Sequence, residues 1–302
     1  MQQDLVQMYD PRWQWSQLHS QLTPGDHEPL LAAFEFAARI HQNQWRKTAS
    51  GKPPVPYMVH PVRVARILLE EWGLRDRKII ATALLHDVLE DCHVSQRDET
   101  ARQVIQIVGQ EVFEAVDALT KSPLPPDVPE DTKNRREANY FRVIRGAEAW
   151  VRLVKCADRV DNLRDARSWG QVDFWVKYKS ETIGWHLYLA RETAPIAEVA
   201  LFKALVDGER ALNGRVPIWA DGNMIDPNAA ELVPEHIALC YNVIGLAKQG
   251  NRLIVGVSDL NFVPEITLAL HSSLHPIDEV LPVKISQEAV DDALKAGMFG
   301  RI

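Results

Sequence analysis

The segment ALLHDVLED, residues 83–91, limits the structure of this chain more than any other segment. Its apolar spacing predicts a helix over residues 77–91, capped by Asp76. Four ionisable side chains stand at the end of that helix: His86, Asp87, Glu90 and Asp91. Such groups beside a core need charged partners. Because imidazole and carboxylate together bind zinc, manganese, iron or nickel, the segment predicts part of a metal site.

Two further residues complete the predicted metal site. His60 lies in MVHPVRVA, just before a predicted helix, and Asp158 lies in the apolar-flanked segment VKCADRVDN. Two His and two Asp ligands leave coordination positions open, which favours Mn²⁺ or Fe²⁺ over a closed structural zinc. On a continuous helix Glu90 and Asp91 stand one turn beyond His86 and Asp87, where they can take or give a proton. Alone, a His–Asp pair arises by chance and His60 could simply cap a helix, so the prediction depends on the whole set.

The composition is that of a globular protein. The chain has 302 residues, 46% of them hydrophobic, and a net charge of -7, which argues against general binding to nucleic acid or an anionic membrane. Its three cysteines show no CxxC pairing, so we expect a reducing compartment. The N-terminus does not resemble a signal peptide, and no apolar run approaches the roughly 20 residues of a membrane span. These features predict a cytoplasmic protein.

The chain divides into two regions by its local pattern. Residues 1–207 read as helices, with a Pro-rich loop at 122–134, a break or kink at Pro195 and no convincing strand before residue 210. Residues 208–231 carry Gly, Pro, Asn and Asp at short intervals, which predicts a linker. Residues 232–302 alternate strands and helices, with NVIGLAK and RLIVGVSD as neighbouring strands. The predicted fold is a multi-domain one: an all-α domain followed by a small α/β domain.

Four segments follow one another in order within about residues 26–200: HQNQWRKTASGKPPVPYMVHPVRVA, ALLHDVLED, VDALTK and KCADRVDNLRD. Together they resemble the corresponding segments of the RelA/SpoT-type alarmone hydrolases of the HD superfamily. The resemblance implies an all-helical HD domain with one Mn²⁺ ion. It implies removal of the 3′-diphosphate of guanosine tetra- or pentaphosphate as pyrophosphate.

The resemblance also implies roles for individual residues. The metal ligands would be His60, His86, Asp87 and Asp158, the residues needed for hydrolysis Glu90 and Asp91, and the nucleotide contacts Arg46, Lys47 and Asn162.

Further side chains near these motifs are candidate substrate contacts. Lys155 and Arg164 add positive charge around Asp158, and Tyr57 is a candidate pocket wall or packing residue. Arg159 is expected to buttress a carboxylate rather than touch the substrate. Without the resemblance, Arg46 and Lys47 could equally be a solvated charge pair, and Trp45 and Trp169 are expected in the core.

Two departures from the family pattern bear on the substrate. The loop between Arg46 and His60 is longer than usual, and Asp165 stands where the family usually has Thr, a carboxylate that would repel a polyphosphate. One alternative is therefore an HD phosphatase for another phosphoester, such as a nucleoside monophosphate or a nicotinamide dinucleotide phosphate. Another is a nucleotide sensor without turnover, against which the intact Glu90–Asp91 pair argues.

Residues 230–298 resemble the α/β part of the N-terminal domain of type II secretion and pilus assembly ATPases. Some such domains bind cyclic di-GMP through upstream RLG and LxxAL elements, which are absent here, so that ligand is not expected. We expect these residues to form a protein-interaction or regulatory module, whose partner the sequence does not identify.

Overall fold

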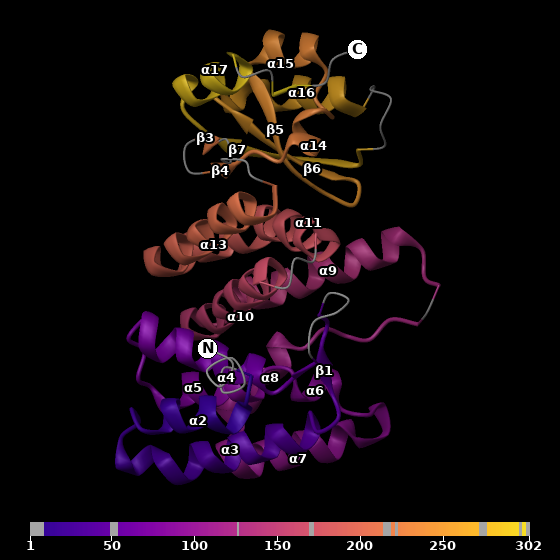
Figure 1. Ribbon diagram of the computed structural model, residues 1–302. Helices are drawn as coiled ribbons and strands as arrows, with labels where there is room; N and C mark the ends of the chain where they lie inside the picture. The colour runs from indigo at the N-terminus through magenta and orange to yellow at the C-terminus, as the bar shows by residue number, and fades with distance from the viewer. Residues whose placement is uncertain are drawn as a thin grey trace.

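The computed structural model describes residues 9–48, 54–125, 127–168, 172–213, 219–220, 223–271, 277–295 and 298–299. Figure 1 shows two parts: helices up to α13, and above them a small sheet with its own helices. We call residues 9–213 the helical part and residues 219–299 the sheet part. The prediction of a mostly helical region followed by a sheet-containing region is confirmed.

The helical part is built around α10. This helix buries residues on most of its circumference and packs against α4, α5, α11, α12 and α13. The helices are α2 (Pro11–His19), α3 (His27–Ile40), α4 (Val59–Arg66), α5 (Arg77–Leu85), α6 (Val88–Asp91), α7 (Arg97–Val108), α8 (Gln110–Leu119), α9 (Glu130–Gly146), α10 (Ala149–Ser168), α11 (Val172–Glu181), α12 (Leu187–Thr193) and α13 (Pro195–Asn213). Shorter turns are η1 (Pro24–Asp26), η2 (Ile67–Glu71), η3 (Val94–Gln96) and η4 (Thr182–His186), of which η2 and η4 are π-helical.

Several predicted helix boundaries are confirmed by local chemistry. The Asp76 side chain accepts a hydrogen bond from the Lys78 N–H and so caps α5. Pro195 starts α13 one residue after α12 ends, because proline suits a first helical position but not an interior one. In contrast, the predicted single helix over residues 77–91 is wrong: it is interrupted at His86 and Asp87.

A short hairpin also departs from the prediction of no strand before residue 210. Strands β1 (Trp45–Arg46) and β2 (Val55–Pro56) pair antiparallel, with Arg46 opposite Val55. Two residues per strand are too few to leave an alternating pattern in the sequence. The hairpin fixes the backbone of Arg46 near the start of α4.

The sheet part contains a three-stranded mixed sheet. Strands β5 (Val243–Gln249) and β6 (Arg252–Val257) form an antiparallel hairpin, with Gly250 in the left-handed region at its turn. Strand β7 (Glu279–Lys284) joins β6 in parallel, after helix α16 (Val263–His271) and turn η5 (Leu260–Phe262). The remaining elements are β3 (Trp219–Ala220), β4 (Asn223–Met224), α14 (Pro227–Ala230), α15 (Glu235–Tyr241) and α17 (Gln287–Lys295).

The two faces of this sheet belong to different apolar clusters. Val243, Leu253 and Val255 pack in a cluster with residues of α15 and α16. Ile244 and Ile254 point the other way and belong to the large cluster that also contains the core of the helical part. Alternation along a strand produces this division, and the sheet therefore packs directly on the helices (Figure 1).

The segment predicted as a linker contains regular structure. Helix α13 continues to Asn213, beyond the expected boundary at residue 207, and β3, β4 and α14 lie within residues 208–231. Every helix among the described residues is too short or too polar to span a bilayer. Cys92, Cys156 and Cys240 are all free thiols.

Candidate metal centre and substrate pocket

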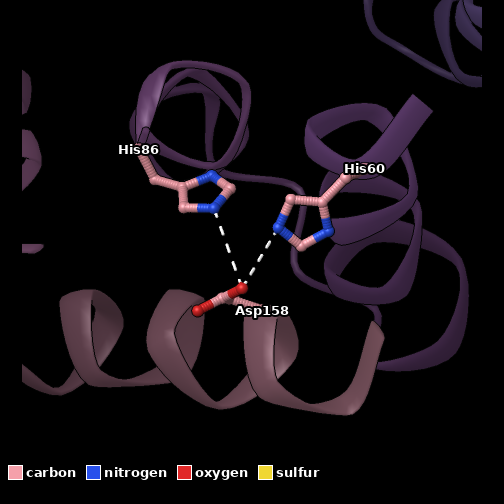
Figure 2. Close-up of side chains that lie close together, drawn as sticks. All are labelled: His60, His86 and Asp158. Carbon is pink, nitrogen blue, oxygen red and sulfur yellow. Dashed lines mark ion pairs between the residues drawn. The ribbon is translucent and has the colours of Figure 1, made fainter. Parts of the chain in front are cut away.

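Three helices bring two imidazoles and a carboxylate together. His60 comes from α4, His86 follows the last residue of α5, and Asp158 lies in the middle of α10 (Figure 2). Nε2 of His60 is 3.1 Å and Nε2 of His86 3.9 Å from Oδ1 of Asp158. All three residues are buried, and a ligand atom from each lies within 4.8 Å of the others. We call these three residues the metal group.

The interruption between α5 and α6 determines where His86 and Asp87 point. His86 Nδ1 bonds the Ala83 carbonyl at 2.8 Å, which turns Nε2 toward Asp158. Asp87, which precedes the first residue of α6, places Oδ2 3.0 Å from His86 Nε2 and 3.7 Å from His60 Nε2. Tyr57 donates its hydroxyl to the same oxygen at 2.7 Å. The Asp87 carboxylate therefore lies beside the two imidazoles of the metal group.

The donor set fits a divalent cation. Nε2 of His86 is buried and has no hydrogen-bond partner of good geometry among the described residues. Nδ1 of His60 bonds Asp161, so Nε2 of His60 presents its lone pair to the same centre. Two imidazole nitrogens and carboxylate oxygens are ligands that first-row divalent metals accept.

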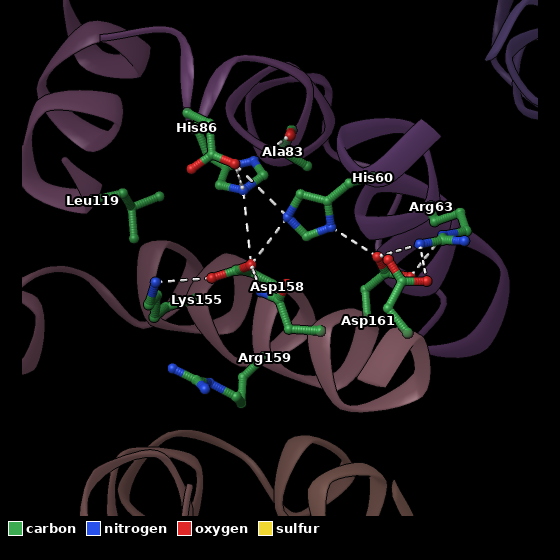
Figure 3. Close-up of polar contacts among 12 residues, drawn as sticks. His60, Arg63, Ala83, His86, Leu119, Lys155, Asp158, Arg159 and Asp161 are labelled. Atoms are coloured by element: carbon green, nitrogen blue, oxygen red, sulfur yellow. Dashed lines mark hydrogen bonds and ion pairs between the residues drawn. The ribbon is translucent and has the colours of Figure 1, made fainter. Parts of the chain in front are cut away.

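The charges around the metal group perturb its titration. Burial alone would lower the pKa of His86, but the Asp87 and Asp158 carboxylates raise it to about 9. Burial alone would raise the pKa of Asp158, whereas Lys155 and the two histidines hold it well below its usual range. Lys155 lies 2.8 Å from Oδ2 of Asp158, on the side away from the histidines (Figure 3).

The two acidic residues after Asp87 have different surroundings. Glu90 lines the pocket, and its Oε2 accepts the Lys121 backbone N–H at 3.1 Å. Asp91 lies 3.5 Å from Nδ1 of His41 and is not among the pocket-lining residues. Burial, with the negative charges of Asp87 and Glu90, raises the pKa of Asp91 to about 7. Of these two acidic residues, Glu90 lines the cavity and Asp91 does not.

A cavity of about 360 Å³ opens beside His60, Asp87 and Asp158. Its wall is polar and carries many cations, which suits an anionic ligand even though the whole chain is acidic. The cationic lining residues are Arg46, Lys47, Lys121, Lys155, Arg159 and Lys177, and the aromatic ones are Trp45, Tyr57, Phe174 and Tyr178.

Most predicted substrate contacts lie on this cavity wall. Arg46, Lys47, Tyr57, Lys155 and Asn162 all line the cavity.

Arg164 is the exception among the predicted substrate contacts. It forms a two-pronged ion pair with Glu71 at 2.6 and 2.8 Å, because its position on α10 faces η2 instead of the cavity.

Two further expectations are corrected by the geometry. Trp45 is 55% exposed at the cavity instead of buried in the core, while Trp169 lies outside the described residues. Asp165 lines the cavity, as its sequence position suggested, but it is not a free carboxylate, since its two oxygens bind Arg46 and Arg63. Arg159 pairs with Glu181 at 2.7 Å, as a buttressing arginine would, and also lines the cavity.

Several cavity residues escaped the sequence reasoning. Lys121 closes the VDALTK motif, and its position in that motif was a signal that could have identified it. Phe174, Tyr178 and Glu181 come from α11 and carry no motif. Arg63 and Asp161 each lie three residues after a predicted ligand, yet only the structure reveals that they contact each other.

Comparisons with known proteins agree with this arrangement. Residues 33–182 match the family model described as HD domain. Guanosine-3′,5′-bis(diphosphate) 3′-pyrophosphohydrolase MESH1 of Homo sapiens is 36% identical over 136 residues, which cover 45% of this chain and 68% of that protein. The chain therefore belongs to the HD domain family, in the group that includes MESH1, and it is a hydrolase of that type.

Longer relatives match over the same region. Guanosine-3′,5′-bis(diphosphate) 3′-pyrophosphohydrolase of Vibrio cholerae is 36% identical over 146 residues, which are 47% of this chain and 19% of that protein. GTP pyrophosphokinase of Myxococcus xanthus is 35% identical over 143 residues, which are 46% of this chain and 17% of that protein.

Proposed function

We propose that this chain is a Mn²⁺-dependent pyrophosphohydrolase of guanosine 3′,5′-bis(diphosphate) or a closely related nucleotide. The observation that carries the proposal is the position of the metal group beside a cavity whose wall is rich in lysine and arginine. A polyphosphate needs this combination of a divalent cation and fixed positive charges. The names of the relatives, such as the Homo sapiens and Vibrio cholerae hydrolases, point to the substrate.

In this proposal His60, His86, Asp87 and Asp158 hold the metal ion. When bound, the ion lowers the pKa of a coordinated water so that a nucleophile forms near neutral pH. The choice of Mn²⁺ is supported by the mixed imidazole and carboxylate donors.

The remaining assigned residues bind the nucleotide or move protons. Glu90 and Asp91 take or give the proton: Glu90 lines the cavity, and Asp91 lies 3.5 Å from Nδ1 of His41. Arg46, Lys47 and Lys155 supply positive charge to the phosphates, and Asn162 and Tyr57 position the nucleoside.

The test is direct. Purified protein with Mn²⁺ should release pyrophosphate from guanosine tetraphosphate, detected by a coupled pyrophosphate assay. Glu90→Gln should abolish release while retaining Mn²⁺ binding, and His86→Ala should lose both. Turnover that survives both substitutions would contradict the mechanism. A panel of nucleoside monophosphates and nicotinamide dinucleotide phosphate tests the substrate, and tight nucleotide binding without product would indicate a sensor.

For the whole chain we propose a catalytic helical domain followed by a regulatory or interaction module in the cytoplasm. The first unit corresponds to residues 1–207, the connecting segment to 208–231 and the module to 232–302. The resemblance of residues 230–298 to the N-terminal domain of secretion and pilus assembly ATPases supports the role of the module.

A further inference from the structure

A closed ring of polar and charged side chains joins the metal group to Arg46. Its first section starts at the metal ligand His60, whose Nδ1 bonds Oδ2 of Asp161 at 2.7 Å. Arg63 lies on the other side of Asp161, with Nε 2.8 Å from Oδ1 and Nη2 3.0 Å from Oδ2 (Figure 3). Asp161 is therefore held between an imidazole and an arginine fork.

The second section connects Arg63 to the cavity wall. Nη2 of Arg63 also contacts Oδ1 of Asp165 at 2.5 Å. The other oxygen of Asp165 accepts from Nε of Arg46 at 2.9 Å. Arg46 lines the cavity, so Asp165 links a buried ion pair to a residue that can touch the nucleotide.

The third section closes the ring. Nη2 of Arg46 donates to Oδ1 of Asn162 at 2.7 Å, and Nδ2 of Asn162 donates to Oδ1 of Asp158 at 2.6 Å. That oxygen is the one that lies 3.1 Å from Nε2 of His60. We call this set the charged ring; its members are His60, Asp161, Arg63, Asp165, Arg46, Asn162 and Asp158.

Because the charged ring is buried, each of its charged side chains needs a well-oriented partner. Asp161 is 2% and Asp165 8% exposed, and the two carboxylates are balanced by the two guanidinium groups of Arg63 and Arg46. Buried ions are tolerated only when each is paired and hydrogen-bonded with good geometry. Displacing one member therefore leaves a charge without its partner, and the side chains bonded directly to that member lose one of their fixed contacts.

We infer that Asp161, Arg63 and Asp165 are positioning residues, which orient the metal ligand His60 and the nucleotide contact Arg46. Asp161 holds the ring of His60 with Nε2 directed at the metal ion, and Asp165 holds the guanidinium of Arg46 against the cavity. Arg63 binds both carboxylates and so connects the two functions. This inference rests on the proposed role of His60 as a metal ligand and of Arg46 as a nucleotide contact.

The inference predicts a division of effects between variants. A carboxylate that orients a metal-binding histidine typically contributes 10–100-fold to metal affinity, so Asp161→Asn should weaken Mn²⁺ binding by about tenfold. Asp165→Asn removes a charged partner of Arg46 without touching a metal ligand. It should raise the KM for the nucleotide by about tenfold and leave Mn²⁺ affinity near that of the wild type. Arg63→Met should impair both.

The experiment measures Mn²⁺ affinity by titration calorimetry without nucleotide, and then KM and kcat at saturating Mn²⁺. Arg66→Gln is the matched control, because Arg66 lies one turn further along α4 and pairs with the exposed Glu70. It should behave as the wild type in both measurements. Thermal unfolding in the absence of metal checks that each variant is folded, and Arg63→Lys replaces Arg63→Met if the latter does not fold.

The outcomes separate this inference from the proposed function. If the wild type binds Mn²⁺ and turns over nucleotide but Asp161→Asn binds Mn²⁺ equally well, the positioning role of Asp161 is wrong. An unchanged KM in Asp165→Asn overturns the positioning role of Asp165. If both Arg63 variants change only the Mn²⁺ affinity or only the KM, Arg63 does not connect the two functions. A wild type that binds no Mn²⁺ contradicts the proposed function itself, and the inference with it.

Discussion

The ammonium group of Lys155 lies 2.8 Å from Oδ2 of Asp158, while Oδ1 of the same carboxylate faces His60. One side chain thus separates a fixed protein cation from the proposed metal position. Both groups are almost completely buried. Lys155, together with the two histidines, therefore holds the pKa of the Asp158 carboxylate well below its usual range.

Replacing Lys155 should make stability depend on metal. Lys155→Met leaves Asp158 with less positive charge around it, so the metal-free protein should lose roughly 3–5 kcal/mol of unfolding free energy. Mn²⁺ should restore part of that loss, because it binds the folded state and supplies the missing charge. Urea unfolding with EDTA and with Mn²⁺ measures both quantities. Equal losses under the two conditions would contradict the electrostatic explanation.

Asp91 should give the metal-free protein a pH-dependent stability. Its pKa is raised to about 7, chiefly by burial, from an unfolded value of about 3.9. A raised pKa contributes stability that is complete below the unfolded value and is lost as pH rises through the folded value. The contribution of this group should therefore fall between about pH 4 and pH 7. Asp91→Asn should flatten the melting temperature across that window in EDTA, and an unchanged profile would argue against it.

Gly208 is a position where a single methyl group should destabilise the fold. A Cβ there would overlap the ring of Trp175, which is fully buried and donates its indole N–H to Glu209 at 2.7 Å. Overpacking of this kind costs about 1–3 kcal/mol, so Gly208→Ala should lower the urea midpoint. Gly146→Ala, in a helix with open space around the new Cβ, is the matched control and should be neutral or stabilising.

The three thiols should differ in reactivity. Cys156 is fully buried, and burial raises its pKa to about 12, whereas Cys240 is exposed and Cys92 is half-buried. A thiolate is the reactive form, so Cys156 should resist a disulfide reagent at pH 8 until the protein unfolds. Cys240 should react first, and Cys240→Ser should remove the fast phase. Rapid modification of Cys156 in the folded protein would contradict the packing around α10.

The three residues of the metal group, which the structure brings together, lie in short local motifs of the sequence. His86 and Asp87 are adjacent, and His60 and Asp158 each have a distinctive flanking pattern. The family resemblance added Arg46, which lines the cavity as expected. The sequence could therefore predict those site residues that lie in short local motifs.

Contacts between distant segments were not predictable in the same way. The prediction of one helix through Asp91 failed because Nδ1 of His86 bonds the Ala83 carbonyl, which in a continuous helix would accept from the Asp87 N–H, and spacing alone does not indicate this. Asp165 read as a repulsive charge because nothing in the sequence places Arg63 beside it. Arg164 was assigned from proximity in sequence, whereas its direction on α10 takes it to Glu71.

The shared packing of the β-sheet has a consequence for dissection of the chain. Because Ile244 and Ile254 lie in the same apolar cluster as the helical core, a polypeptide cut at Asp207 would expose that cluster to water. The catalytic half would then be prone to association, and calorimetry of the intact chain should show a single cooperative melting transition. The sheet part is thus a structural component of the helical enzyme on which it packs.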